Sequence, residues 1–151
     1  SLPTIKITFN KERDGMANMK AVYLGDLRVE CTHIASGTTI VTDAPVDNNG
    51  KGEAFSPTDL CATALASCCM TIIGIYAKTH DIDVTGTSIE ITKIMSVDPR
   101  RIGRIEITFD MPDREYLPRQ KAAIENCAHT CPGHLSVHPD VEQVFKFNWK
   151  K

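Results

Sequence analysis

Two adjacent thiols lie in the middle of an apolar stretch of helical length. Cys68 and Cys69 follow Ala-Leu-Ala-Ser and precede Met-Thr-Ile-Ile. Helix formation does not require a sulfur-containing side chain at these positions. A cysteine thiolate can, however, act as a nucleophile, a metal ligand or a redox group. Consecutive helical residues are rotated by about 100° from one another, so the two thiols face different directions. We therefore expect them to do different jobs.

The other cysteines are spread along the chain. A chain of this length does not need disulfide bonds for stability, and it shows no secretory segment. We therefore expect its cysteines to be buried apolar side chains, metal ligands or redox groups rather than a disulfide framework. Cys131 differs because Pro132 and Gly133 break a helix immediately after it, which would leave its side chain able to swing towards a partner. We expect the remaining thiols to pack as small apolar side chains, namely Cys31, Cys61, Cys69 and Cys127.

Composition limits the class of protein. The 151 residues, 42% of them hydrophobic, suit a single domain over residues 1–151. A net charge of -2 gives no indication of the basic surface that nucleic-acid binding requires. No uninterrupted apolar run reaches the roughly 18 to 20 residues of a membrane span. The first residues lack the pattern of a signal peptide. We expect a cytoplasmic protein with neither nucleic acid nor membrane as a partner.

Hydrophobic periodicity predicts an N-terminal antiparallel sheet. Alternation of apolar and polar residues favours a strand over residues 3–9, and residues 19–24 and 27–34 favour a hairpin around Gly25-Asp26. One more short strand is expected over residues 38–42. Asn, Gly and Asp then mark residues 43–55 as a loop.

A long helix should follow this sheet. Ser56 can cap it, Pro57 suits the first helical position, and Asp59 completes a capping box. Residues 60–78 are apolar nearly all round, which predicts burial on most sides. Further along, the pattern predicts strands over 88–94 and 102–111, a turn at Asp98-Pro99, a helix over 118–128 and a strand over 144–149. This order of elements predicts an α+β fold.

Two motifs resemble those of the OsmC/Ohr family of thiol-dependent peroxidases. The segment Ser56-Pro57-Thr58-Asp59-Leu60, followed eight residues later by Cys68, resembles the central-helix motif of that family. The segment Cys131-Pro132-Gly133-His134 resembles its second-cysteine motif. The order and separation of the motifs are also similar, and the similarity spans residues 3–149. The resemblance to this family rests on the presence of both motifs, because neither motif alone is specific to it.

The resemblance implies an OsmC-like fold, with antiparallel sheets around a long buried central helix, and an intertwined homodimer with active sites at its interface. It implies that Cys68 attacks the peroxide and that Cys131 resolves the product as a disulfide. The implied partners are a small-molecule peroxide and a thiol or dithiol reductant, without a cofactor or a metal. Around Cys68 we expect apolar residues that favour organic peroxides, among them Leu65, Met70 and Ile72.

A cation should stabilise the Cys68 thiolate, because apolar surroundings disfavour the charged form. In the family an N-terminal Arg supplies it, and Arg13 within Arg13-Asp14-Gly15 matches a triplet found in some members, with Arg28 as the competing candidate. The organic-hydroperoxide members carry a Glu where this chain has Thr58. This departure resembles the more divergent OsmC-like branch of the family, and Asp59 would point away from Cys68 as a capping residue.

Two other readings stay open. Cys127, His129, Cys131 and His134 form a dense group of soft ligands that could hold a metal, although their spacing differs from that of structural zinc sites. Alternatively, the protein is a dimer that binds an apolar ligand or senses redox state without enzymatic activity, with Cys68 simply packed.

Overall fold

The computed structural model describes residues 6–9 and 16–151. The chain divides into two compact units, one ending at Phe55 and the other beginning at Ser56. The expectation of a single domain over residues 1–151 stays a prediction.

The first unit contains a three-stranded antiparallel sheet in the order β1-β2-β3. Its strands are β1 (Met19–Gly25), β2 (Arg28–His33) and β3 (Thr39–Asp43), which confirms the predicted hairpin and third strand. The hairpin turns at Asp26 and Leu27, whose backbones are both left-handed with φ of 52° and 61°. That geometry matches the right-handed twist of the flanking strands.

Two features of this unit differ from expectation. The strand predicted over residues 3–9 does not form in its described part, residues 6–9, and residues 3–5 lie outside the described residues. The predicted loop contains a short 3-10 helix, η1 (Val46–Asn48). Large apolar side chains of β1, including Met19, Val22 and Tyr23, are more than half exposed. The sheet therefore leaves much apolar surface uncovered within its own unit.

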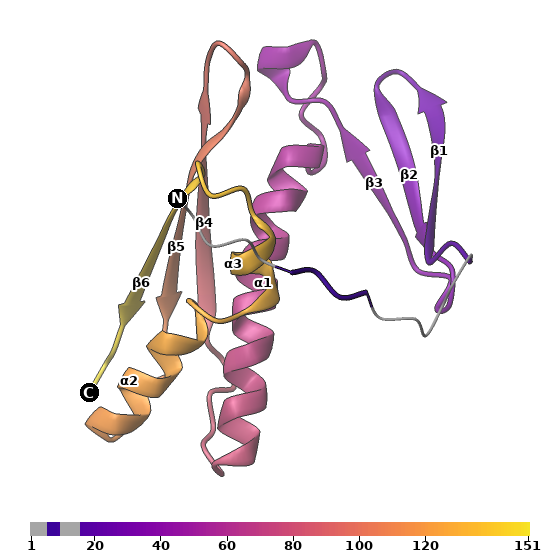
Figure 1. Ribbon diagram of the computed structural model, residues 1–151. Coiled ribbons are helices and arrows are strands. Elements are labelled where there is room, and N and C mark those ends of the chain that lie inside the picture. The colour runs from indigo at the N-terminus through magenta and orange to yellow at the C-terminus, as the bar shows by residue number, and fades with distance from the viewer. Residues whose placement is uncertain (1–5, 10–15) are drawn as a thin grey trace. The chain divides into compact units, whose positions relative to one another are not determined.

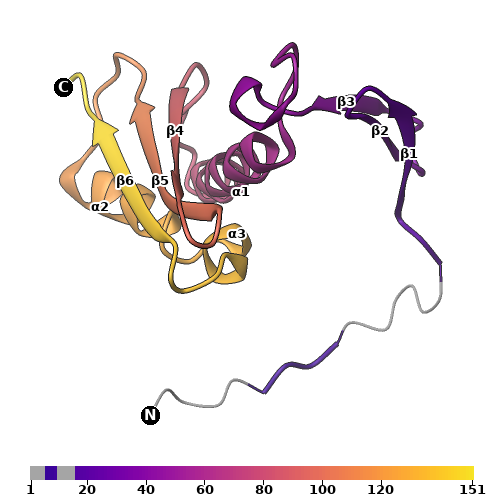
Figure 2. The same cartoon turned by 90° about the horizontal axis from the view of Figure 1, so that it is seen from above.

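The second unit begins with the long helix α1 (Pro57–Thr79), seen end-on in Figure 2. Its capping box is present: the N–H of Asp59 donates to Ser56 Oγ, and the Asp59 carboxylate accepts from the N–H of Ser56, both at 3.0 Å. The remaining elements are two helices, α2 (Pro118–Cys127) and α3 (Pro132–Ser136), and three strands, β4 (Ser88–Ser96), β5 (Arg101–Asp110) and β6 (Glu142–Asn148) (Figure 1).

The second sheet has the order β4-β5-β6 and is mixed rather than wholly antiparallel. β4 and β5 run antiparallel through the predicted turn, whereas β6 runs parallel to β5. Parallel neighbours require a crossover, and here α2 and α3 return the chain to the start of β6 (Figure 1). The α+β class is confirmed, with this one difference in strand direction.

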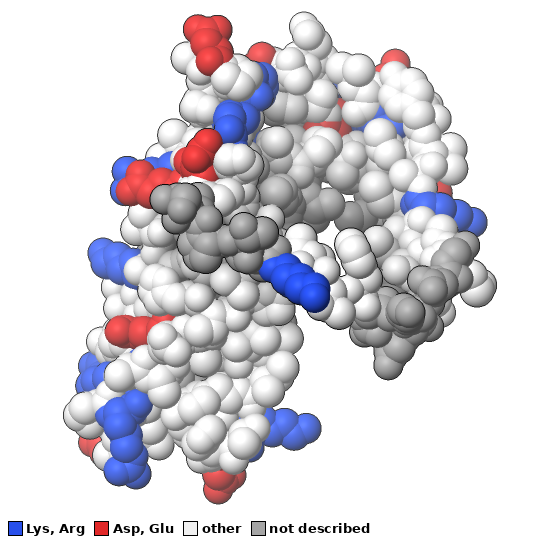
Figure 3. Space-filling model, in the orientation of Figure 1, with Lys and Arg blue, Asp and Glu red and all other residues white. Residues whose placement is uncertain are grey.

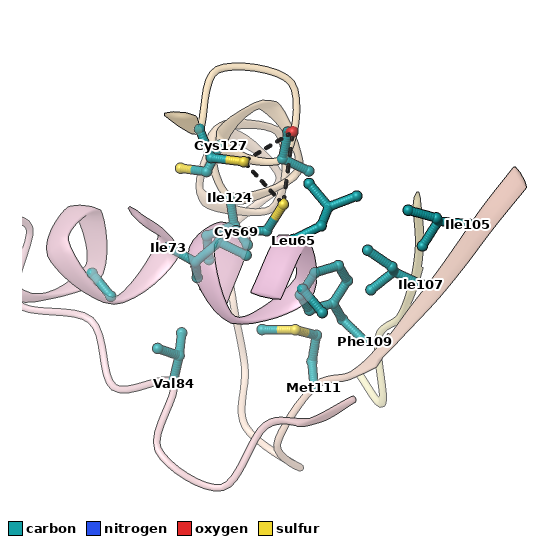
Figure 4. Close-up of a cluster of buried hydrophobic side chains, with 14 of the residues drawn as sticks. Leu65, Cys69, Ile73, Val84, Ile105, Ile107, Phe109, Met111, Ile124 and Cys127 are labelled. Atoms are coloured by element: carbon teal, nitrogen blue, oxygen red, sulfur yellow. Dashed lines mark hydrogen bonds between the residues drawn. The ribbon is translucent and has the colours of Figure 1, made fainter. Parts of the chain in front are cut away.

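The core of this unit lies between α1 and the sheet. Leu65, Cys69 and Ile73 of α1 are fully buried and belong to the same cluster as Ile107 and Phe109 of β5 (Figure 4). The opposite side of α1 is exposed at Cys61, Ser67, Thr71 and Ile75, so the helix is buried on fewer sides than expected within this chain. By length and composition α1 could span a membrane, a property shared by core helices of soluble proteins.

Charged side chains of both signs are mixed on one face of the second unit. On the face of the second unit seen in Figure 3, Lys and Arg alternate with Asp and Glu, separated by uncharged residues. Ion pairs such as Arg104 with Glu106 and Arg114 with Asp83 join some of them. This face therefore carries no single-sign field that would steer a charged partner.

Candidate functional site

Cys68 lines a cavity of about 670 Å³ in the second unit. The walls come from the first half of α1, the start of β5 and the segment from α3 to β6, and most of them are apolar, including Leu65, Ile102 and Val137. The Cys68 side chain is half-buried, so its sulfur is both sheltered and open to the cavity. A cavity of this size suits an organic molecule of moderate size.

The sulfur of Cys68 has a backbone donor. The N–H of Gly133 points at Cys68 Sγ over 3.2 Å. Gly133 lies in the first turn of α3, where N–H groups have no partner within the helix and remain free to bind other acceptors. A methyl group at Gly133 would lie 3.0 Å from Cys68 Cβ and 3.4 Å from Cys68 Sγ. The close approach of α3 to Cys68 therefore depends on glycine at this position.

Cys131 does not have the freedom that its place before Pro132 suggested. Pro132 begins a new helix, α3, and Cys131 is the N-cap, with its Sγ accepting the N–H of His134 at 3.3 Å. The side chain is fully buried, and its sulfur lies 3.1 Å from the sulfur of Cys69. The prediction of a swinging side chain is wrong because α2 already ends at Cys127 and Pro132 begins a new helix that fixes Cys131 as its N-cap.

Cys69 is the fully buried neighbour of Cys68 and points from α1 towards the segment after α2 (Figure 4). The carbonyl of Ala128 lies within reach of both thiols, at 3.9 Å from Cys69 Sγ and 3.7 Å from Cys131 Sγ. Burial raises the pKa of Cys69, and the neighbouring Cys131 thiol raises it further. Cys69 is therefore held as a neutral thiol in contact with a second thiol.

The remaining cysteines take different positions. Cys127 is buried as expected; burial raises its pKa, and its S–H donates to the Ala123 carbonyl at 3.3 Å. Cys31 is half-buried in the first unit. Cys61 is exposed at the cavity, so the expectation that it fills the core is wrong. Seven residues before Cys68, it lies on the face of α1 that lines the cavity.

The apolar residues expected around Cys68 separate into three places. Leu65 lines the same cavity as Cys68, as predicted. Met70 lines another cavity, of about 470 Å³, together with Ile89 and Ile91 of β4. Ile72 packs against the core. Met70, two residues after Cys68, points about 200° away from it around the helix, whereas Ile72 lies on nearly the same side but one turn further along α1.

The arginine expected to face Cys68 is not identified by the described residues. Arg13 lies outside them. Arg28 lies in the first unit and pairs with two carboxylates, at 3.5 Å from the fully buried Asp43 and 2.5 Å from Glu53. Sequence reasoning missed Arg101, which lines the cavity at the start of β5. Nothing in its local sequence distinguishes it, because only strand pairing brings β5 beside α1.

Thr58 and Asp59 at the start of α1 share a lysine that sequence reasoning also missed. Lys93 of β4 contacts the Asp59 carboxylate at 2.8 Å and donates to Thr58 Oγ1 at 2.9 Å. The hydrogen bond from Lys93 is the largest cause that lowers the pKa of Asp59. Thr58 lines the cavity whereas Asp59 is not among the lining residues, which agrees with the capping role expected for Asp59.

The candidate ligands Cys127, His129, Cys131 and His134 do not come together as a metal site. His134 Nδ1 contacts Gln143 Oε1 at 2.7 Å, and the His134 ring lies edge-on to His129 and Phe145. Over residues 6–9 and 16–151, no three His, Cys, Asp or Glu side chains are placed to hold a metal ion. The metal-binding reading gains no support from this geometry.

Comparison with known proteins agrees with the fold. A family model described as OsmC-like protein matches residues 50–144. The structure of a putative osmotic stress induced and detoxification response protein from Psychrobacter arcticus 273-4 is 47% identical over 91% of this chain and 99% of that one, with a TM-score of 0.86. None of the curated proteins compared matches this chain.

Two more distant structures share the fold. An organic hydroperoxide resistance protein OsmC from Legionella pneumophila is 19% identical over 86% of this chain and 94% of that one, with a TM-score of 0.64. A putative organic hydroperoxide resistance protein from Vibrio cholerae, with captopril bound in one of its active sites, is 15% identical over 93% and 97%, with a TM-score of 0.67.

Proposed function

Because this chain belongs to the OsmC-like protein family, we propose that it is a thiol-dependent peroxidase that reduces organic hydroperoxides at Cys68. The observation that carries the proposal is the position of Cys68 Sγ, which lines an apolar cavity and accepts a backbone N–H from Gly133. Structural relatives named as organic hydroperoxide resistance proteins support the substrate class.

The reaction needs few groups. The Cys68 thiolate attacks one oxygen of the hydroperoxide, the O–O bond breaks, and the other oxygen leaves as an alcohol after taking a proton. Cys68 becomes a sulfenic acid, which condenses with the Cys131 thiol to form a disulfide and release water. A thiol or dithiol reductant then restores both thiols. The Gly133 N–H, already directed at the sulfur, binds a thiolate more strongly than a neutral thiol.

The cavity favours organic over hydrogen peroxide. An alkyl or aryl group that moves from water onto walls such as Leu65, Ile102 and Val137 gains about 0.8 kcal/mol for each buried CH2 group. Hydrogen peroxide has no apolar part and gains nothing from these walls. The enzyme should therefore react faster with cumene hydroperoxide than with hydrogen peroxide.

Peroxide consumption by the reduced protein, with a thiol or dithiol reductant present, tests this proposal. We expect the wild type to consume cumene hydroperoxide faster than hydrogen peroxide, and Cys68→Ser to consume neither. Cys31→Ser, which changes a half-buried thiol of the first unit, serves as the control and should match the wild type. An inactive wild type, or turnover that survives in Cys68→Ser, would contradict the proposal.

The apolar cavity also favours a second candidate, a protein that binds an apolar ligand without enzymatic activity. The two functions differ in what they require of the sulfur. A catalytic Cys68 should react with iodoacetamide faster than a free cysteine does, whereas a packed Cys68 should react more slowly. This second function would be favoured if the wild type consumes no peroxide and if Cys68→Ser binds an apolar ligand with the same affinity as the wild type.

A further inference from the structure

Resting on the proposed function, we propose that Cys69 is a third redox-active residue, which takes over the disulfide from Cys68 and stores the oxidation in the core as a Cys69–Cys131 disulfide. The observation that carries this proposal is the 3.1 Å contact between the sulfurs of Cys69 and Cys131, both fully buried. The roles proposed above for Cys68 and Cys131 do not use this contact.

The geometry separates the tasks of the three thiols. Of Cys68, Cys69 and Cys131, Cys68 alone lines the cavity, so a peroxide reaches Cys68 and not the two buried sulfurs. Cys69 cannot resolve Cys68 directly, because neighbouring helical residues point about 100° apart. Cys131 lies where α3 begins, the same helix whose Gly133 N–H binds Cys68 Sγ. Any disulfide that Cys68 passes to Cys69 must therefore travel through Cys131.

The relay has three steps, each balanced. Peroxide oxidises the Cys68 thiol to a sulfenic acid and leaves as an alcohol. The Cys131 thiol condenses with it, forming the Cys68–Cys131 disulfide and water. The Cys69 sulfur then attacks the sulfur of Cys131, the new disulfide forms, and Cys68 leaves with the proton that Cys69 gave up. The last step is an exchange without net oxidation, so it needs no additional oxidant.

The surroundings favour the end product. Burial disfavours a charged sulfur at Cys69, as its raised pKa indicates, but a disulfide carries no charge and is not penalised by burial. The sulfurs need to approach by only about 1 Å to reach the bond length of about 2.05 Å. The rare thiolate of Cys69 slows the exchange, whereas contact with its target accelerates it. The Gly133 N–H donates a hydrogen bond to the sulfur of Cys68, the leaving group of this exchange.

The relay predicts an unusual stoichiometry. Once the disulfide has moved to Cys69, Cys68 is a free thiol again and can react with a second peroxide before any reductant acts. The wild type without reductant should therefore consume two equivalents of peroxide per chain. It should end with a Cys69–Cys131 disulfide and a Cys68 sulfenic acid in the same molecule.

The first experiment titrates reduced protein with cumene hydroperoxide in the presence of dimedone, which traps sulfenic acids. Fragmentation between Cys68 and Cys69 in the mass spectrometer assigns each modification. We expect two equivalents in the wild type, with dimedone on Cys68. The variants Cys69→Ser and Cys69→Ala should each consume one equivalent of peroxide. They should form a Cys68–Cys131 disulfide without a dimedone adduct. Far-UV circular dichroism confirms that each variant is folded.

Cys127→Ser is the matched control, because Cys127 is another buried thiol of the same core whose S–H bonds elsewhere, to the Ala123 carbonyl. It should consume two equivalents, like the wild type. A wild type that consumes one equivalent and retains a Cys68–Cys131 disulfide would overturn the relay while leaving the proposed peroxidase intact.

A second experiment tests the relay without peroxide. In a background with Cys31, Cys61 and Cys127 changed to Ser, an aromatic disulfide such as dithiodipyridine reacts with Cys68 and releases one thiopyridine. Resolution by Cys131 releases a second, and exchange with Cys69 frees Cys68 to release a third. We expect three, with the remaining pyridyl group on Cys68 and a Cys69–Cys131 disulfide by mass spectrometry, and two after the additional Cys69→Ala change. The same result in a protein that does not consume peroxide would reject the peroxidase but retain the relay. Release of only two with Cys69 present, or a pyridyl group on Cys69, would reject the relay.

Discussion

The backbone N–H of Gly133 donates to the sulfur of Cys68 over 3.2 Å, joining the middle of α1 to the first turn of α3. The two residues lie 65 positions apart in the chain. The contact is close because Gly133 has no side chain: a Cβ there would lie 3.0 Å from Cys68 Cβ and 3.3 Å from Leu65 Cδ1. The sulfur of Cys68 thus has a donor that is positioned by the backbone before any substrate binds.

Gly133→Ala should slow the reaction with peroxide. The new methyl group meets Cys68 Cβ at 3.0 Å, so Cys68 and α3 must separate by a few tenths of an ångström, which lengthens the contact between the Gly133 N–H and the sulfur. A hydrogen bond to a charged acceptor contributes about 1.5 to 3 kcal/mol, so we expect the second-order rate constant with cumene hydroperoxide to fall about tenfold or more. Stopped-flow measurement of the first turnover checks this.

Gly74→Ala is the matched control for that change. Gly74 lies in α1, and a Cβ at this position meets nothing within 4 Å. Replacing a glycine inside a helix should raise the free energy of unfolding by about 0.5 to 1 kcal/mol and leave the rate constant unchanged. Equal rate constants for the wild type and Gly133→Ala would contradict the role given to the Gly133 N–H.

Arg101→Ala should also slow peroxide reduction. Arg101 is the only arginine among the cavity-lining residues of the described chain, so its charge can favour the Cys68 thiolate and the departing alkoxide. Its side chain is 37% exposed, and such charge interactions are worth about 1 kcal/mol or less, so we expect at most a fivefold loss. Rate constants across a range of salt concentrations should converge for the wild type and the variant if charge is the cause.

The expected role of Arg13 or Arg28 is tested in the same assay. Arg13→Ala, or Arg28→Ala if Arg13 is the wrong candidate, should reduce the rate constant with both peroxides. Arg28→Ala should in addition lower stability, because it leaves the buried carboxylate of Asp43 without its cation. If none of the three arginine variants differs from the wild type in rate, the cation-assisted mechanism is wrong.

Asp59→Asn should lower stability at neutral pH and not in acid. The pKa of Asp59 is lowered from 3.8 in the folded protein, mainly by Lys93, so its carboxylate stabilises the fold fully above pH 3.8 and loses this effect as pH falls through the lower folded value. We expect a loss of about 1 kcal/mol at pH 7, limited by the 43% exposure of the side chain. Urea unfolding at pH 7 and below pH 3 measures it. A difference that persists in acid would assign the effect to something other than this charge.

A homodimer should form in solution. Apolar side chains remain exposed on both units, among them Tyr23 of β1 at 63% and Ile75 of α1 at 58%, and such surfaces mark association sites. Light scattering at micromolar concentration should give twice the mass of the chain. Ile75→Glu should weaken association more than the neighbouring control Lys78→Glu, which changes a residue that is already charged. A monomeric wild type would contradict the dimeric architecture.

The sequence by itself determined the elements whose causes are local. The capping box of Ser56 and Asp59 set the start of α1, and alternating or helical periodicity located β1 to β6 and α2 within a few residues. The motif around Cys68 identified the thiol that lines the cavity. These features depend on neighbours in the chain, and so their signals are present in short stretches of residues.

Only the tertiary structure decided what depends on residues distant in the chain. Periodicity cannot indicate that β6 runs parallel to β5, because a strand has the same alternation in either direction. Nor could spacing show that Cys131 meets Cys69, 62 residues away, or that Arg101 lines the cavity of Cys68. These contacts arise when α1, the sheet and α3 pack together, since packing brings together side chains that carry no signal of one another in the sequence.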